Sequence, residues 1–192
     1  MVESKIKYEI LVIGGSAGSI EVVMQIIPQL PRKFPLAVVV VLHRKPMNVD
    51  LLLGLLQNKS HIWIKIAENN DPILPGLVYL APSDYHLRVD KKRTIILDHN
   101  EKIKHSRPSI DVAMQSVGDV YKEKSIGIVL TGANEDGASG LKAIMDSGGS
   151  VIIQEPLTAQ APTMPLAARH TTNGKTMEVP EIINFLLQLS NG

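Results

Sequence analysis

The chain has 192 residues, of which 44% are hydrophobic and 20% charged, so it can bury the core of one domain and is not generally disordered. Its 20 basic and 19 acidic residues give a formal net charge of +1. That balance argues against nucleic acid as the main partner, because phosphate binding needs a concentrated basic face. The chain has no cysteine, which excludes a disulfide scaffold, a thiolate zinc site and a cysteine nucleophile.

The N-terminal residues are too polar to open a secretory signal. No apolar run along the chain reaches the roughly 18 residues that span a bilayer. We therefore expect a single cytoplasmic domain over residues 1–192, with no membrane insertion.

Short runs of β-branched residues recur along the chain, and their apolar residues are nearly continuous rather than alternating. Such runs are typical of strands in a parallel sheet that helices cover on both faces. The predicted strands are Ile10–Ile13, Ala37–Leu42, Ile62–Ile66, Ile126–Leu130 and Val151–Ile153. Helical spacing of apolar residues follows near 20–27, 51–56, 112–120 (with Ser109 as N-cap), 141–145 and 182–187. This alternation predicts an α/β fold: a doubly wound, mostly parallel sheet with helices on both faces.

Residues 79–97 depart from that alternation. Three short runs follow one another: Tyr79–Ala81, His86–Val89 and Thr94–Leu97. The charged turn Asp90–Arg93 lies between the last two, which predicts an antiparallel hairpin at one edge of the sheet. The polar stretch that follows, Asp98–Arg107, is expected to form a mobile surface loop.

In an open α/β sheet, ligands bind beyond the carboxyl ends of the strands. The first strand is followed by Gly14-Gly15-Ser16-Ala17-Gly18, which fits the pattern G-x-S-x-G of a sharp turn that exposes a serine. The next helix is expected to begin near Ser19, so its free N–H groups would face Ser16 and suit an oxyanion or a phosphate. The pattern alone allows either a nucleophilic serine or a turn that only binds a nucleotide.

A nucleophilic serine needs a base, and the base needs an acid that orients it. His43 comes directly after the second strand, and the loop Thr131–Ala138 carries the adjacent acids Glu135 and Asp136. Either acid could orient His43, whereas Asp136 could instead cap the helix predicted over 138–146. Backbone N–H groups of the same loop could contribute to an oxyanion hole. No pair of histidines has the i,i+4 spacing of a zincin, so no metal site is expected.

Further motifs follow in order over roughly residues 8–187. They are Ile13–Gly18, Val41–His43, Leu74–Pro82 with His86, Arg107–Asp111, Leu130–Ala138, Gln154-Glu155 and Met164-Pro165. Together they resemble the catalytic domain of the chemotaxis protein-glutamate methylesterases. The resemblance implies a serine hydrolase with Ser16 as nucleophile, His43 as base and Asp136 as orienting acid, and with no metal or organic cofactor. Backbone donors near Ala17 and Ala133 are then expected to hold the oxyanion.

Members of this family hydrolyse γ-glutamyl methyl esters on cytoplasmic helices of chemoreceptors, and some deamidate glutamine at the same sites. The resemblance therefore implies a protein-glutamate methylesterase whose partner is a methylated, chemoreceptor-like helix. The family usually has Thr at Ala17, Gly-Met-Gly at Gly132-Ala133-Asn134, and Met-Pro after the histidine. These departures leave open two alternatives of the same fold: a catalytically silent interaction domain and a phosphate- or nucleotide-binding module.

Two expectations concern the surroundings of the site. Arg44 and Lys45, directly after His43, could attract acidic residues of a substrate helix or only keep the loop soluble. Family members usually carry an N-terminal receiver domain. Only a few residues precede the first predicted strand here, so we expect a domain that stands alone or was excised from a longer chain.

Overall fold

The computed structural model describes residues 8–43 and 49–190. Its largest element is a seven-stranded sheet in the order β3-β4-β2-β1-β7-β8-β9, in which every neighbouring pair is parallel. The strands of this sheet are β1 (Ile10–Gly15), β2 (Ala37–Leu42), β3 (Trp63–Ile66), β4 (Leu77–Leu80), β7 (Ser125–Val129), β8 (Ser150–Gln154) and β9 (Lys175–Met177). The chain winds to one side of β1 through β2 and to the other side through β7, so β1 lies at the switch point of a doubly wound sheet.

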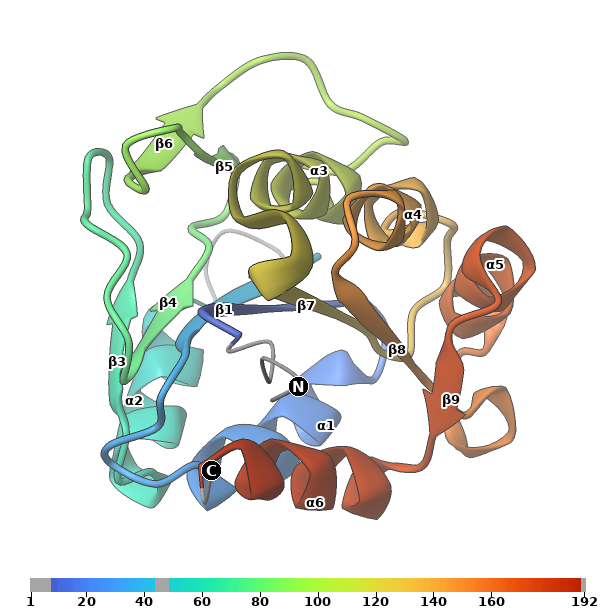
Figure 1. Ribbon diagram of the computed structural model, residues 1–192, viewed down its shortest axis with the longest axis horizontal. Coiled ribbons are helices and arrows are strands. Elements are labelled where there is room, and N and C mark those ends of the chain that lie inside the picture. Colours follow the sequence, from blue (N-terminus) through green and yellow to red (C-terminus); the bar gives the residue numbers. More distant parts are fainter. Residues whose placement is uncertain (1–7, 44–48, 191–192) are drawn as a thin grey trace, which may run out of the picture.

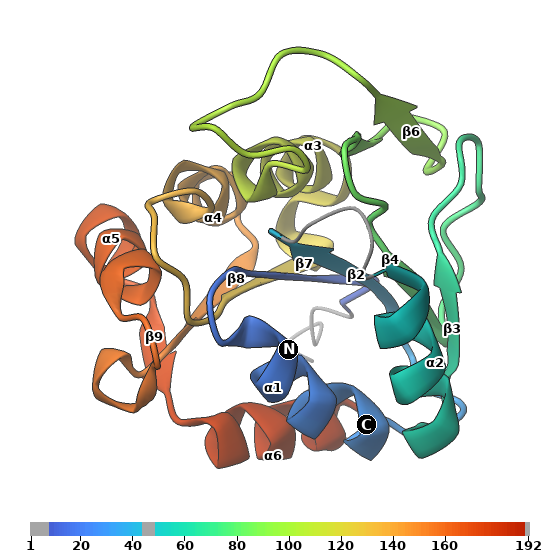
Figure 2. The ribbon, with the colours of Figure 1, turned by 180° about the vertical axis from the view of Figure 1, so that it is seen from behind.

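Helices cover both faces of the sheet (Figures 1 and 2). The helices are α1 (Ser19–Ile26), α2 (Val49–Lys59), α3 (Ile110–Tyr121), α4 (Ala138–Asp146), α5 (Thr163–Thr172) and α6 (Val179–Leu189), with short 3₁₀ turns η1 (Ile27–Gln29), η3 (Lys122–Lys124) and η4 (Pro156–Thr158). Helices α1, α2 and α6 pack on one face, and α3, α4 and α5 pack on the other. The predicted fold class is confirmed.

Burial on both faces explains the continuous apolar runs of the central strands. Every residue of β1 and β2 is buried. Alternate side chains enter the two cores: Leu11 and Ile13 pack with α1 and α6, whereas Ile10 and Val12 pack with α3 and α4. Neither set can be polar, so the strand shows no alternation.

The predicted hairpin is present, and it forms a two-stranded sheet of its own instead of extending an edge of the large sheet. Its strands are β5 (His86–Val89) and β6 (Ile95–Asp98), paired antiparallel. The hairpin lies beside α3, where the Val89 N–H donates to Ser116 Oγ at 3.0 Å. Residues 99–107 then lead from β6 to the start of α3.

Helix α3 begins very close to the end of β1, and Gly14 permits this approach. A Cβ atom at Gly14 would overlap Cγ2 of Ile110, the first residue of α3. The helix N-terminus therefore lies directly above the carboxyl end of the central strand.

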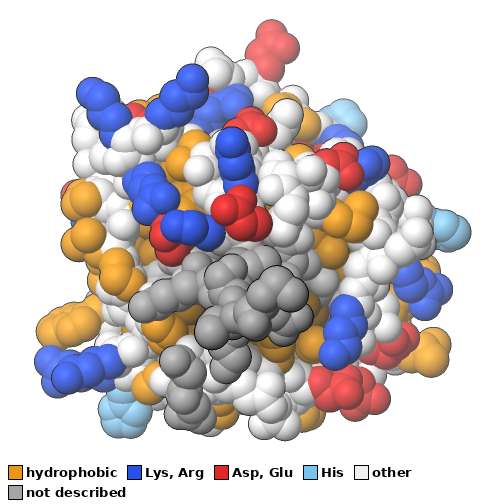
Figure 3. All heavy atoms as spheres, viewed as in Figure 1, with side chains coloured by type: hydrophobic (Ala, Val, Ile, Leu, Met, Phe, Trp, Pro, Cys, Tyr) orange, Lys and Arg blue, Asp and Glu red, His pale blue; other side chains and the backbone are white. Residues whose placement is uncertain are grey.

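The surface carries charges of both signs. On the face shown in Figure 3, Lys and Arg side chains are interspersed with Asp and Glu and do not form one basic face. In the described part of the chain, no helix is long and apolar enough to cross a bilayer.

Candidate active site

The loops after β1, β2 and β7 meet at the carboxyl end of the sheet. Gly15 pairs with Leu42 in the register of β1 and β2, so Ser16 and His43 are the next residues along adjacent strands. The His43 N–H donates to the Gly15 carbonyl at 3.1 Å, and the Ser16 N–H donates to the Thr131 carbonyl at 3.0 Å. The parallel pairing therefore places Ser16 between the histidine loop and the loop that carries Asp136.

Ser16 lies immediately before the N-terminus of α1. Gly18 is the N-cap of this helix with φ +77°, a left-handed conformation that favours glycine. The Ser19 N–H turns back to the Ser16 carbonyl at 3.0 Å. Among the described residues, the N–H groups of Ala17 and Gly18 have no acceptor, so both are available to an anion beside Ser16.

His43 and Asp136 are in direct contact, with His43 Nε2 2.7 Å from Asp136 Oδ2. The Asp136 side chain is fully buried and accepts three more hydrogen bonds. They come from Ser109 Oγ at 2.9 Å, the Ile110 N–H at 2.6 Å and the Asp111 N–H at 3.0 Å. All three donors belong to the first turn of α3 or its N-cap, so the carboxylate lies at the positive end of that helix.

The surroundings of Asp136 decide its charge. Burial acts to raise the pKa of this carboxyl, but the hydrogen bonds from His43, Ile110 and Asp111 outweigh burial and hold the pKa below its ordinary value. Asp136 is therefore ionised at neutral pH. Since a carboxylate can only accept, His43 Nε2 carries a proton and Nδ1 has the free lone pair when the ring is neutral.

Asp111 makes the matching contact in the opposite direction. Its Oδ1 accepts the Gly137 N–H at 2.8 Å and the Gly140 N–H at 2.7 Å, both at the start of α4. Lys104 Nζ donates to its Oδ2 at 2.8 Å. The alternative in which Asp136 caps α4 is thus wrong: Asp111 from α3 binds these N–H groups, and Asp136, which precedes α4, binds those of α3.

Of the two adjacent acids, Asp136 is the one that contacts His43. The Glu135 side chain is exposed, and its backbone carbonyl accepts from Lys104 Nζ at 3.2 Å. Ala133, in the same loop, is also exposed. Within the described ranges its N–H has no acceptor, as expected for an oxyanion donor.

Two side chains that the sequence had not suggested lie at the other ring nitrogen of His43. Ser106 Oγ and Asn134 Nδ2 are each 3.3 Å from Nδ1. The Asn134 Oδ1 accepts the Asp136 N–H at 3.1 Å. In the described part of the chain Ser16 Oγ has no hydrogen-bond partner. The hydrogen-bond partners of His43 Nδ1, the nitrogen that would face Ser16 in a catalytic triad, are instead Ser106 and Asn134.

His86 positions Ser109, one of the hydrogen-bond donors of Asp136. It is fully buried, its Nδ1 accepts the Ser109 N–H at 3.1 Å, and its Nε2 lies 3.0 Å from the Glu101 carbonyl. Arg107 holds the same loop by donating to Asp84 Oδ1 from Nη2 at 2.6 Å and from Nε at 3.0 Å. His86 and Arg107 stand in the motifs of the sequence, but no role could be assigned to them, because their partners, Ser109 and Glu101 for His86 and Asp84 for Arg107, are 15 to 23 residues away along the chain.

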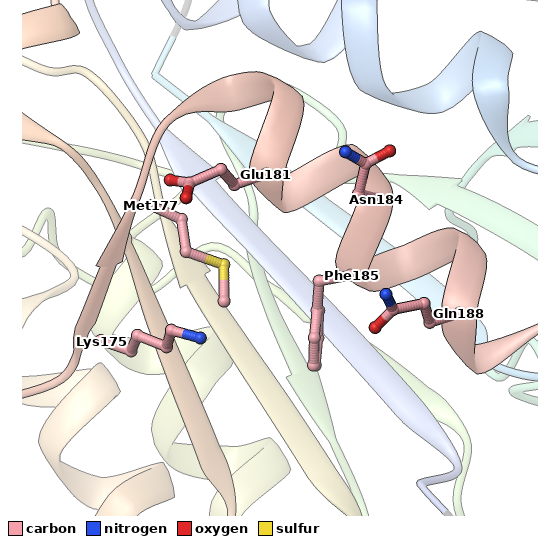
Figure 4. A pocket seen from close by; sticks show the side chains of 6 residues that line it. All are labelled: Lys175, Met177, Glu181, Asn184, Phe185 and Gln188. Atoms are coloured by element: carbon pink, nitrogen blue, oxygen red, sulfur yellow. The ribbon is translucent and has the colours of Figure 1, made fainter.

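Other expectations have simpler outcomes. Arg44 and Lys45 lie outside the described residues. Within the ranges that the structure describes, no group of three or more histidine, aspartate or glutamate side chains could hold a metal ion. A shallow hollow of about 240 Å³ lies between β9 and α6 (Figure 4). It is lined by Lys175, Met177, Glu181, Asn184, Phe185 and Gln188, and so it shares no residue with the site above.

The family model of the CheB methylesterases matches residues 11–186. A Leptospira interrogans protein, provisionally named protein-glutamate methylesterase/protein-glutamine glutaminase, is 42% identical over 166 residues, which are 86% of each chain. A Thermotoga maritima protein of that name is 36% identical over 160 residues, and the match covers 82% of this chain and 46% of the longer relative. The crystal structure of the Thermotoga maritima CheB methylesterase catalytic domain is similar with a TM-score of 0.89 and 32% identity, over 95% of this chain and 98% of that one.

Proposed function

This chain belongs to the CheB methylesterase family, and we propose that it hydrolyses γ-glutamyl methyl esters on a helix of a chemoreceptor-like protein. The observation that carries the proposal is the buried His43–Asp136 pair beside Ser16 at the switch point of the sheet. The names of the relatives support the reaction class, and the contact between His43 and Asp136 supports the choice of residues.

In this proposal Ser16 is the nucleophile and His43 the general base. The Ser16 hydroxyl turns to His43 Nδ1, gives its proton to that nitrogen and forms a bond to the ester carbonyl carbon. The positive charge that develops on the ring is stabilised by Asp136, whose pKa is held low by its hydrogen bonds with His43 and with the Ile110 and Asp111 N–H groups of α3. The proton on Nδ1 then passes to the methoxy oxygen as the C–O bond breaks, and methanol leaves.

The acyl-enzyme is cleaved by the same groups in reverse. A water molecule gives a proton to His43 Nδ1 and attacks the glutamyl–serine ester, and the proton returns to Ser16 as the glutamate carboxyl is released. In both tetrahedral intermediates the oxyanion lies beside Ser16. The free N–H groups of Ala17 and Gly18 at the start of α1, and of Ala133 across the site, are the donors we assign to it.

Deamidation of glutamine follows the same path with ammonia in place of methanol. No step requires a redox group or a metal, because the leaving group departs by proton transfer alone.

An active-serine probe tests the proposal against both alternatives. A fluorophosphonate should label the wild-type chain and leave Ser16→Ala and His43→Ala unlabelled, and the wild type should release methanol from a methylated receptor-type protein. A silent interaction domain would show no labelling in any variant. A phosphate-binding module would bind inorganic phosphate equally well in wild type and His43→Ala.

A further inference from the structure

Asn134 has a fixed orientation at the base nitrogen of His43. The half-buried amide could point either way by shape alone, but its oxygen receives the Asp136 N–H at 3.1 Å. A backbone N–H needs an acceptor, so the Asn134 NH₂ group must face His43 Nδ1, where it lies at 3.3 Å. Asn134 therefore presents a hydrogen-bond donor, and no acceptor, at the atom that transfers the proton.

We infer that Asn134 is a specificity-determining residue that favours the ester over the amide as leaving group. The inference rests on the proposed function, because it assigns His43 Nδ1 as the atom that protonates the leaving group. Any atom that accepts this proton sits within hydrogen-bond distance of Nδ1 and hence near the Asn134 NH₂ group. The contact between Asn134 and the leaving group is therefore part of the step that breaks the bond.

The two leaving groups differ in what they can accept. A methoxy oxygen has two lone pairs, so it takes the proton from His43 Nδ1 and a second hydrogen bond from Asn134 Nδ2. An amide nitrogen in the tetrahedral intermediate has one lone pair, which His43 uses, and its own N–H groups are directed at the Asn134 donor. Two donors facing each other lose the hydrogen bonds that each would make in water.

Ser106 offers a matched comparison at the same nitrogen. Its hydroxyl is also 3.3 Å from His43 Nδ1, but a hydroxyl donates or accepts as its hydrogen rotates. It can therefore adapt to either leaving group. We therefore expect Ser106 to affect both reactions equally, because its hydroxyl has a rotational freedom that the amide of Asn134 lacks.

The test uses two versions of one synthetic helical peptide that differ at a single residue, γ-glutamyl methyl ester or glutamine. The measured quantity is the ratio of kcat/KM for methanol release to kcat/KM for ammonia release. Asn134→Asp is the decisive variant, since it keeps an oxygen for the Asp136 N–H and replaces the donor by an acceptor of the same shape. The ratio should fall about tenfold in Asn134→Asp and about fivefold in Asn134→Gly, the size expected for one hydrogen bond. In Ser106→Ala it should stay within about twofold.

The outcomes separate this inference from the proposed function. An equal loss of both activities in Asn134→Asp, or an unchanged ratio, would overturn the specificity role and leave Ser16 chemistry standing. If wild-type ammonia release is below detection, the inference requires newly detectable ammonia release in Asn134→Asp, and its absence overturns the inference. Methanol release that survives in Ser16→Ala would overturn the proposed function itself. Thermal unfolding of each variant shows whether it is folded.

Discussion

Replacing Asp136 by asparagine should destabilise the fold as well as impair the reaction. The two carboxylate oxygens accept four hydrogen bonds, and every partner is a donor. An asparagine keeps one accepting oxygen and places an NH₂ group against the other pair. In one orientation this group faces the Ile110 N–H and His43 Nε2, and in the other it faces Ser109 Oγ and the Asp111 N–H. The Ser109 hydroxyl can rotate away, but a backbone N–H cannot.

The size of the effect follows from what the variant leaves unpaired. A buried N–H without an acceptor costs about 1–3 kcal/mol. Loss of the anion at the N-terminus of α3 removes about 0.3–1 kcal/mol more, and up to about 2 kcal/mol in a buried setting. We therefore expect the free energy of unfolding to fall by about 2–4 kcal/mol. Against the roughly 5–15 kcal/mol of an ordinary domain, the variant remains folded but is clearly weakened.

The loss should depend on pH in one direction. The pKa of Asp136 is lower in the fold than in the unfolded chain, so its carboxylate stabilises the fold fully above the unfolded-state pKa. That contribution disappears as the pH falls through the lower, folded-state pKa. The difference between wild type and Asp136→Asn should therefore be constant around neutral pH and shrink in acid.

Urea unfolding of both proteins at pH 7 and at stepwise lower pH measures this difference. Glu135→Gln is the control, because the exposed neighbour should change the free energy of unfolding by less than about 0.5 kcal/mol. Equal stability of Asp136→Asn and wild type at pH 7, or a difference that grows in acid, would refute the conclusion that the Asp136 carboxylate stabilises the N-terminus of α3.

Three further predictions concern other parts of the site. Ser16→Ala and His43→Ala should each remove nearly all methanol release, with the double variant little worse, since each residue acts through the other; additive losses would contradict this. Gly14→Ala should lower the free energy of unfolding, measured by thermal unfolding, by about 1–3 kcal/mol, because its Cβ would overlap Ile110. Gly54→Ala in α2 is the control: nothing lies within 4 Å of the added Cβ, so this variant should be as stable as wild type or slightly more stable. His86→Leu should cost about 1–3 kcal/mol in urea unfolding, because the Ser109 N–H loses its buried acceptor, and a stability equal to wild type would show that this hydrogen bond is replaced.

The parts of the fold that could be predicted from the sequence are those whose burial leaves a pattern. Strands β1 and β2 have helices on both faces and so read as continuous apolar runs. Strand β9 is three residues long at the sheet edge, and only its last residue is buried, so pairing with β8 leaves no apolar signal. The apolar pattern does not predict helix α5 for a similar reason: its buried residues include Pro165 and Thr172, which form no apolar stripe.

The candidate site divides in the same way. Parallel strands end at one edge of the sheet, so the loops that follow them are expected to meet there, and this argument brings together Ser16, His43 and the acid pair Glu135 and Asp136. Only the family resemblance selects Asp136 from that pair. Ser109 was predicted as an N-cap, and its hydroxyl does accept the Val112 N–H, but its bond to Asp136 depends on how α3 packs. Ser106 and Asn134 reach His43 through loop conformations that no periodicity records.

Two carboxylates link the N-termini of α3 and α4: Asp136, before α4, accepts N–H groups of α3, and Asp111 of α3 accepts N–H groups at the start of α4. This reciprocal contact explains how a buried Asp136 can stay charged beside His43. An isolated buried carboxylate would rise in pKa and become neutral, and a neutral acid could not stabilise the imidazolium. Asp136 stays ionised because His43 and the Ile110 and Asp111 N–H groups of α3 donate to it, and α3 is held against α4 by the reverse contact of Asp111 with Gly137 and Gly140. The charge that the proposed reaction needs on Asp136 is therefore maintained in part by the packing of two helices, and changes in that packing should alter activity before they unfold the domain.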